Sequence, residues 1–168
     1  KFEFDSQPGY QKMNKENKLV PGLPSGFEDR WDKKLLLKKK LLKAIENNFI
    51  KFGAEALETP SFEISENIGS FLAEDDANPM SDVFSIQDGD KSITLRYDLS
   101  SPLARFYAQN NQELPSIFKR YQIQNVFRNE KAGNGRYREF LQADFDIVGN
   151  VNPAQANAEL CNLISSTL

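Results

Sequence analysis

Segment 125–149 carries three arginines, a glycine-rich stretch and, in its second half, a strict alternation of side chains. A period of two is typical of a β-strand, because successive side chains of a strand point to opposite faces. One face would carry Arg138, Phe140, Gln142, Asp144 and Asp146. The opposite, mostly apolar face would carry Glu139, Leu141, Ala143, Phe145 and Ile147. We therefore interpret residues 118–128 and 138–148 as antiparallel strands joined by a loop over 129–137.

The polar face of the second strand places a phenylalanine between an arginine and an amide, which is unusual for a solvated surface. We predict that it binds an anionic, flat and amine-bearing ligand. Arginine forms bidentate contacts with phosphate, so Arg128, Arg136 and Arg138 are candidates for a polyphosphate site, and Phe140 offers a stacking surface for a base. The alternative is a surface hairpin on which these arginines only form cross-strand ion pairs. The carboxylates available for such pairs are Glu130, Glu139 and Asp144.

Composition narrows the chemistry further. The chain has no histidine, which removes the commonest general base and disfavours Ser-His hydrolases and zinc enzymes. Twenty-one basic against 24 acidic residues give a net charge of −3, so any nucleic-acid contact is expected to be local. A single cysteine, Cys161, suits a reducing compartment, and no segment approaches the ~20 apolar residues of a membrane span. We expect a globular, cytoplasmic protein without membrane contact.

The remaining pattern predicts an α+β fold with an antiparallel sheet. Residues 1–20 are interpreted as a flexible N-terminal arm, and 73–81 as a loop. The other predicted elements are a helix over 32–52 that ends at Gly53, a short strand over 54–59, a partly helical connection over 62–72, a strand pair over 83–87 and 91–99 with Asp98 at its end, a helix from 101 to about 110, and a helix after Pro153.

The hairpin resembles motif 2 of the class II aminoacyl-tRNA synthetases. Its start, FRNE at 127–130, is similar to several members of the class. The continuation GRYREFLQ at 135–142 and DFDIVG at 144–149 resembles the histidyl-tRNA synthetases in particular. Upstream, LRYDLSSPLAR at 95–105 resembles the segment with which that family holds the amino group of its substrate. Two matched segments in the right order favour membership of this family over coincidence.

The resemblance extends from about Pro21 to Leu168 and implies a class II synthetase-like antiparallel sheet flanked by helices. Residues from about 44 to 62 resemble motif 1, the family's dimer-forming element, and about 118–149 are motif 2, so a homodimer through the motif 1 region is implied. Because the chain begins at Lys1 and stops inside a predicted helix, we interpret 21–168 as the N-terminal portion of the catalytic domain, truncated before motif 3 and without the anticodon-binding domain. We expect such a fragment alone to be incomplete as an enzyme.

The resemblance implies a role for each residue at one end of the hairpin. Arg128 would hold the α-phosphate of ATP and stabilise the charge that develops there. Glu130 would contact the adenine, and Phe140 would stack on it. Arg136 would reach the terminal phosphates or the acceptor end of the tRNA, and Arg138 is a second candidate for the tRNA contact.

At the other end, Asp98, Ser100 and Gln142 would hold the α-amino group of histidine, and Asp146 would accept a hydrogen bond from its imidazole. Asp98 and Asp146 stand where many family members have Glu, and Ser100 where Thr is usual, so the substrate is expected to sit slightly differently. The implied reaction is ATP-dependent formation of histidyl-adenylate, followed by transfer to the 3′ end of tRNA(His). Mg²⁺ would be held mainly by the ATP phosphates, and no protein side chain is assigned to it.

A rival interpretation is a non-catalytic synthetase paralogue, similar to the regulatory subunit that binds histidine and controls ATP phosphoribosyltransferase. Such proteins keep the fold and lose site residues, so the fold alone does not decide function. The presence of the full set of motif 2 residues favours the ligase. These residues are Arg128, Glu130, Arg136, Phe140 and Gln142.

Overall fold

The computed structural model describes residues 21–69 and 83–167. Within these residues, pairs of strands are separated by helices, and the fold is α+β. The predicted arm over 1–20 and the predicted loop over 73–81 lie outside these residues. In chain order the elements are α1 (Asp32–Lys51), β1 (Glu55–Ala56), β2 (Phe62–Ile64), α2 (Ser65–Gly69), β3 (Ser85–Asp88), β4 (Lys91–Leu95), α3 (Ser100–Asn110), β5 (Ile117–Phe127), β6 (Glu139–Gly149) and α4 (Pro153–Thr167). None of the helices within the described ranges combines the length and the apolar character needed to cross a membrane.

The strands form two three-stranded sheets, ordered β1-β5-β6 and β2-β4-β3. The long hairpin predicted from the alternation is confirmed, because β5 and β6 pair along their whole length, from Ile117 opposite Gly149 to Phe127 opposite Glu139. One pair differs from the antiparallel prediction: β1 runs parallel to β5, with Glu55 opposite Arg120. Between β1 and β5 the chain builds the small sheet and α3, and such a long crossover is what a parallel pair requires.

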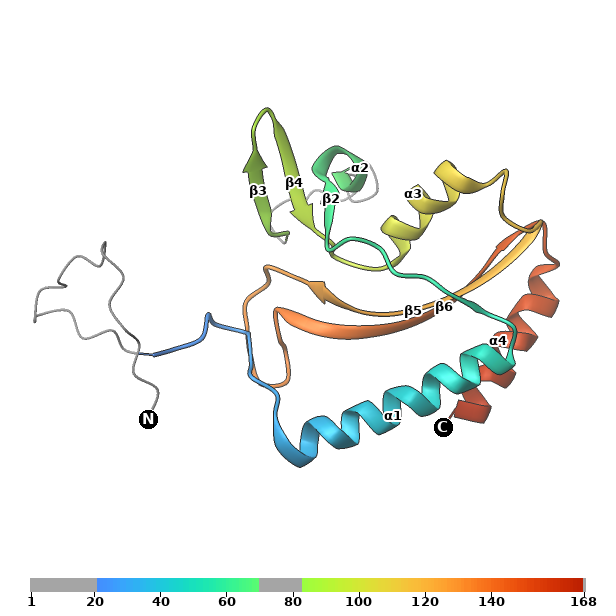
Figure 1. Cartoon of the computed structure of the whole chain (residues 1–168), viewed down its shortest axis with the longest axis horizontal. Coiled ribbons are helices and arrows are strands. Elements are labelled where there is room, and N and C mark those ends of the chain that lie inside the picture. Colours follow the sequence, from blue (N-terminus) through green and yellow to red (C-terminus); the bar gives the residue numbers. More distant parts are fainter. Residues whose placement is uncertain (1–20, 70–82, 168) are drawn as a thin grey trace, which may run out of the picture.

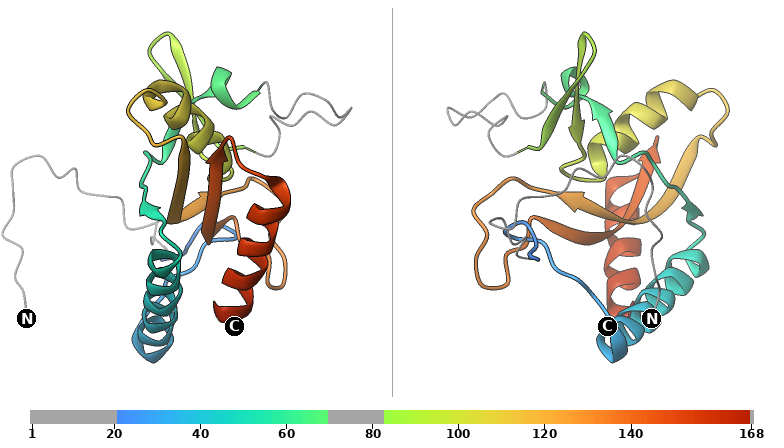
Figure 2. Two further views of the ribbon diagram at one scale, coloured as in Figure 1. Left: turned by 90° about the vertical axis from the view of Figure 1, so that its right-hand side faces the viewer. Right: turned by 60° about the vertical axis from the view of Figure 1, so that its left-hand side comes forward.

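Helices α1 and α4 cover one face of the β5–β6 hairpin, whereas α3 and the small sheet lie on the other side (Figure 1). The same separation is seen in the two rotated views of Figure 2. The core lies on the helical side, where the ring of Phe49 packs 5.9 Å from that of Tyr121 and 5.6 Å from that of Phe145, with Leu163 of α4 closing the cluster. This apolar packing leaves the opposite face of the hairpin free for polar side chains.

Helix α1 matches its predicted span and ends at the predicted glycine. Gly53 has a φ of +79°, a conformation that L side chains rarely adopt, and its N–H donates to the carbonyl of Ile50 at 2.9 Å. The stop directs the chain into β1 and places Phe49 and Ala54, both buried, beneath the hairpin.

Strand β4 ends at Leu95, four residues before its predicted end. The reason is Arg96, whose side chain is only 4% exposed and turns into the protein. Its Nη1 donates to the carbonyl of Thr59 at 2.7 Å and its Nε to the carbonyl of Asn125 at 2.6 Å. These bonds tie the small sheet to the large one, and the prediction that Asp98 ends a strand was therefore wrong: Asp98 lies in the turn before α3.

Candidate active site

The face of the hairpin turned away from α1 and α4 is lined by polar side chains, which we call the polar floor. The polar floor consists of Arg120, Gln122 and Gln124 of β5 and Gln142, Asp144 and Asp146 of β6. The strand register sets them in opposed pairs, with Arg120 opposite Asp146, Gln122 opposite Asp144 and Gln124 opposite Gln142. The alternation predicted for β6 thus gives a polar face that carries predicted ligand-binding residues and a second face that packs into the core through Phe145.

Arg128 lies at the loop end of the polar floor, just after β5. Its guanidinium carbon is 4.3 Å from the ring centroid of Tyr97 and 5.0 Å from that of Phe140, so the cation is held between two aromatic rings. The backbone N–H of Arg128 donates to the carbonyl of Arg138 at 2.9 Å, which continues the pairing of the two strands. Aromatic rings fix the guanidinium without neutralising it, so its charge stays available for an anion.

The other two arginines of the motif have different partners. Arg136 forms an ion pair with Glu130, its Nε donating to Oε2 at 2.6 Å, so the ion-pair alternative is confirmed at this position. The hydroxyl of Tyr97 also donates to Glu130 at 3.4 Å. Arg138 donates from Nε to the carbonyl of Glu130 at 2.8 Å and from its backbone N–H to the carbonyl of Gly26 at 2.8 Å. Arg138 thereby holds the loop against the turn before α1, while Arg136 remains largely exposed.

Asp98 and Ser100 lie where the chain enters α3. The Asp98 carboxylate accepts a hydrogen bond from the backbone N–H of Ser101 at 3.1 Å, which satisfies one of the free N–H groups in the first turn of the helix. Ser100 is the first residue of that helix. The carbonyl of the intervening Leu99 accepts a hydrogen bond from Arg120 Nη2 at 3.1 Å, so this turn is anchored directly to the polar floor.

Charge is concentrated at the far end of the polar floor. Arg120 is fully buried, and its Nη2 lies 2.7 Å from Asp146 Oδ2. Burial lowers the pKa of Arg120, whereas the carboxylates of Asp146, Asp144 and Asp98 act to raise it. Burial raises the pKa of Asp144, an effect that Arg120 opposes and that Asp146 and Asp98 reinforce. One buried cation therefore faces three carboxylates from two segments of the chain.

Four buried side-chain atoms lack a hydrogen-bond partner within the described part of the chain: Arg120 Nε, Arg128 Nε, Gln142 Oε1 and Asp146 Oδ2. The Asp146 oxygen is within ion-pair distance of Arg120 but outside hydrogen-bond geometry, so both findings hold. Buried polar atoms are normally satisfied, and an exception needs a physical reason. All four belong to the polar floor or to Arg128 at its end. Arg120 is fully buried, but Arg128, Gln142 and Asp146 are only partly buried, which is the pattern expected where a polar ligand supplies their missing partners.

The β5 half of the polar floor was missed by the sequence interpretation. Arg120 and Gln122 are fully buried, and Gln122 donates to the hydroxyl of Thr59 at 2.8 Å. The signal was present, because Phe118, Arg120, Gln122, Gln124 and Val126 alternate with the side chains that face the helices. Strand pairing then places this row opposite the predicted site residues of β6.

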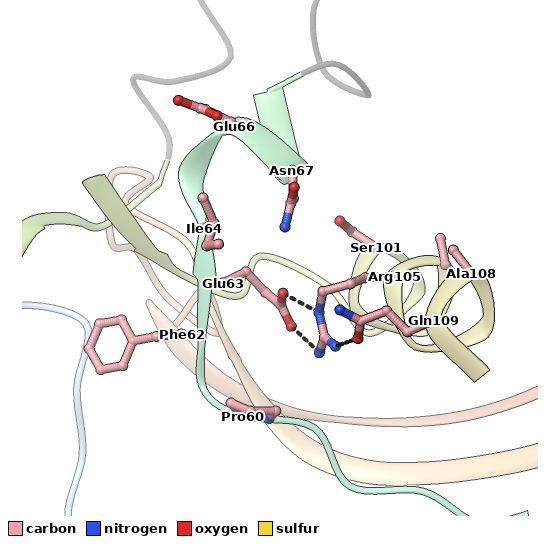
Figure 3. Close-up of a pocket in the computed structure, with 11 residues that line it drawn as sticks. Pro60, Phe62, Glu63, Ile64, Glu66, Asn67, Ser101, Arg105, Ala108 and Gln109 are labelled. Carbon is pink, nitrogen blue, oxygen red and sulfur yellow. Dashed lines mark hydrogen bonds and ion pairs between the residues drawn. The ribbon is translucent and has the colours of Figure 1, made fainter. Parts of the chain in front are cut away.

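A pocket of about 600 Å³ lies between the β2–α2 segment and α3 (Figure 3). It is bordered by β2, α2 and α3, and Glu63 and Arg105 meet in it through a bidentate ion pair with N–O distances of 2.6 and 2.8 Å. Because these charged groups satisfy each other and none of the predicted site residues lines the pocket, we place the candidate site on the polar floor.

Residues 26–168 match the family model described as histidyl-tRNA synthetase. The chain belongs to the histidyl-tRNA synthetase family. Among curated members of that family, the histidine–tRNA ligase of Pelagibacter ubique (strain HTCC1062) is 81% identical over 156 residues, which is 93% of this chain and 34% of the relative. The histidine–tRNA ligase of Rhodopseudomonas palustris (strain TIE-1) is 42% identical over 94% of this chain and 31% of its own length. The chain thus spans about a third of these histidyl-tRNA synthetase relatives.

Solved structures of the histidyl-tRNA synthetase family share the fold. The histidyl-tRNA synthetase from Nostoc sp. PCC 7120 superimposes with a TM-score of 0.68 at 26% identity, over 86% of this chain and 34% of that one. A Bacillus halodurans C protein titled as an ATP phosphoribosyltransferase regulatory subunit/histidyl-tRNA synthetase gives a TM-score of 0.75 at 23% identity, over 90% of this chain and 38% of that one. The second likeness concerns the fold alone.

Proposed function

We propose that residues 21–168 form the N-terminal portion of the catalytic domain of a histidine–tRNA ligase, with ATP and histidine bound along the polar floor. One observation carries the proposal: the buried atoms without hydrogen-bond partners in the described residues include Arg128 Nε at one end and the oxygens Gln142 Oε1 and Asp146 Oδ2 farther along. ATP offers an anion to the first, and an amino acid offers N–H donors to the others. Family membership supports the same assignment.

The ATP end of the proposed site centres on Arg128. Its Nε has no partner and its guanidinium is fixed between Tyr97 and Phe140, so it can contact the α-phosphate without first breaking an ion pair. Adenine would lie near Glu130 and Phe140. The side chain of Arg136 is exposed and pairs with Glu130, so it could exchange that carboxylate for a terminal phosphate or the acceptor end of tRNA(His). Arg138 supports this loop and is the secondary candidate for the tRNA contact.

The histidine end of the proposed site uses the carboxylates. Asp98, Ser100 and Gln142 would receive the α-ammonium group, and Asp146, whose side chain is 34% exposed, would accept from the imidazole N–H. Phe140 and Asp146 are six residues apart on one strand, roughly 20 Å at about 3.3 Å per residue. That length accommodates a nucleotide and an amino acid laid end to end on one face.

In the proposed reaction an oxygen of the histidine carboxylate attacks the α-phosphorus of ATP, and the bond to the leaving pyrophosphate breaks. A terminal ribose hydroxyl of the tRNA then attacks the carbonyl carbon of histidyl-adenylate and displaces AMP. Neither step needs a protein nucleophile, so the chain's residues act by positioning the reactants and by stabilising charge. The proposal assigns Mg²⁺ to the ATP phosphates, where it would neutralise charge on the leaving group.

The proposed partners follow from the same assignment. The complete protein would bind histidine, ATP and tRNA(His) in the cytoplasm and would form a homodimer through the region from about 44 to 62, which includes the end of α1, all of β1 and the start of β2. The decisive experiment is histidine-dependent ATP–pyrophosphate exchange by the full-length protein that contains this chain, with Arg128→Ala as the comparison. Absence of exchange in the unmodified protein, or exchange unchanged by the substitution, would contradict the proposal.

A further inference from the structure

Arg120 has no role in the function proposed above, yet it occupies the centre of the histidine end. It is fully buried near the start of β5 and contacts three other residues. Nη1 donates to Gln122 Oε1 at 3.0 Å, Nη2 donates to the carbonyl of Leu99 at 3.1 Å, and Nη2 also lies 2.7 Å from Asp146 Oδ2. The guanidinium therefore touches both segments assigned to histidine.

We propose that Arg120 is a positioning residue for the amino acid: it holds the turn 98–100 and the carboxylate of Asp146 at a fixed separation, and it sets the negative charge that the amino acid meets. This inference rests on the proposed function, because it concerns the same site. No surface of Arg120 is exposed, whereas Asp146 is partly exposed, so we assign Arg120 no direct contact with the ligand. It acts through the groups that it holds.

The contacts of Arg120 connect two distant segments of the chain. The turn 98–100 and Asp146 come from parts of the chain almost fifty residues apart. Arg120 donates a hydrogen bond to a backbone carbonyl of the first and forms an ion pair with the carboxylate of the second. The planar guanidinium presents its donors in a fixed fork, so binding one segment restricts where the other can lie. Gln122 receives a further N–H of Arg120 and donates to Thr59, which anchors the fork to the segment beyond β1.

The groups around Arg120 are predominantly acidic. The ionisable groups that face Arg120 are Asp98 in the turn before α3 and Asp144 and Asp146 on β6. Carboxyl groups outnumber the guanidinium three to one here, so this end of the polar floor suits the α-ammonium group of an amino acid. A buried ion pair of this kind contributes little to stability by itself, because the desolvation of both partners offsets their attraction. Its location between the two histidine-binding segments is what the positioning role explains.

The test measures KM separately for histidine and ATP in the pyrophosphate exchange of the full-length protein. With Arg120→Met we expect the KM for histidine to rise at least about tenfold and the KM for ATP to change less than about twofold, because only the histidine end loses its support. Arg120→Lys keeps the charge without the fork and should recover part of the loss. Arg105→Met is the matched control. Like Arg120, Arg105 pairs with a carboxylate on another element, in this case Glu63, but it lies outside the polar floor. Its KM for histidine should stay unchanged.

The pH dependence of kcat/KM for histidine distinguishes the proposed role of Arg120 from a general loss of structure. Arg120 lowers the pKa of Asp144, so its removal should raise that pKa further and move the acidic limb of kcat/KM for histidine to higher pH. Equal increases in both KM values, or an unmoved acidic limb, would overturn the inference. If circular dichroism shows that Arg120→Met does not fold, Arg120→Lys is tested instead. That variant must raise the KM for histidine but not the KM for ATP, and the absence of such a selective rise would also overturn the inference. Absence of exchange in the unmodified protein would instead refute the proposed function.

Discussion

The two ends of the polar floor hold an arginine in opposite ways. Arg128 lies between two aromatic rings, with Nε unsatisfied and its charge free for a ligand. Arg120 is fully buried among Asp98, Asp144 and Asp146, and its charge is committed to them. An arginine packed by rings is suited to contact an anion, whereas one packed by carboxylates is suited to fix those carboxylates for a cationic ligand. One hairpin face thereby provides an anion-binding end and a cation-binding end.

Removing the free arginine should have the largest effect. Arg128→Ala is expected to lower the kcat of histidine-dependent pyrophosphate exchange roughly 10²- to 10³-fold, the range seen when a group that stabilises developing charge is deleted. Arg128→Lys should remain severely impaired, because lysine cannot reproduce the planar stack on Tyr97 and Phe140. Steady-state exchange rates measure both variants. Near-normal kcat in Arg128→Lys would show that charge alone matters at this end.

Asp146→Asn tests the opposite end of the polar floor. The amide keeps the shape of the carboxylate but loses its charge, both for the imidazole N–H and for Arg120. We expect the KM for histidine to rise roughly 10- to 100-fold, as a charge-assisted hydrogen bond in a buried site is worth about 1.5–3 kcal/mol. The KM for ATP should change little, and Asp88→Asn at the exposed end of β3 should change neither KM. A parallel rise in the KM for ATP would show that the two ends are not separable.

The parts of the fold that follow from a local sequence pattern were predicted correctly. The alternation in 138–148 gave β6 its two faces, and Gly53 correctly marked the end of α1. Arg128 and Asp146 were predicted as site residues, and each has a buried atom without a hydrogen-bond partner in the described residues. These features follow from local spacing, which a single sequence displays.

The features that were missed depend on contacts between distant segments. The alternation along β5 places Arg120 on one face of the strand, but only its register with Asp146 shows what it contacts there. Strand β1 is two residues long, too short for a period to reveal a parallel pairing. Residues 62–64 were interpreted as a connection, but they form β2 by pairing with β4. The strand predicted over 91–99 stops at Leu95, because Arg96 binds backbone carbonyls inside the protein.

The aromatic support of Arg128 should have an intermediate effect. Phe140→Leu keeps the apolar volume but removes a ring that faces the guanidinium at 5.0 Å. We expect the KM for ATP to rise roughly five- to tenfold, because a cation–π contact in a desolvated site is worth about 1–2 kcal/mol and the same ring is proposed to stack on adenine. Tyr97→Phe is the control: it keeps its ring against Arg128 and loses only a long hydrogen bond to Glu130, so its KM for ATP should change less than about twofold. A larger change in Tyr97→Phe than in Phe140→Leu would make the hydroxyl, not the rings, the important group.

The smallest effect concerns stability at the carboxylate end. Burial raises the pKa of Asp144 above its ordinary value, so the folded protein binds this proton more tightly than the unfolded chain does. Asp144 therefore destabilises the folded protein least at acidic pH. The free energy of unfolding falls as the pH rises from the ordinary aspartate pKa through the raised one. Asp144→Asn removes the ionisation, and we expect it to raise Tm by about 2 °C at pH 7 and by nearly nothing at about pH 3.5, as measured by thermal melts across this range. Asp90→Asn in the exposed β3–β4 turn should leave Tm unchanged at both values. A lower Tm for Asp144→Asn at pH 7 would mean that Arg120 needs all three carboxylates, and that attraction outweighs desolvation at the end of the polar floor where the cation is buried.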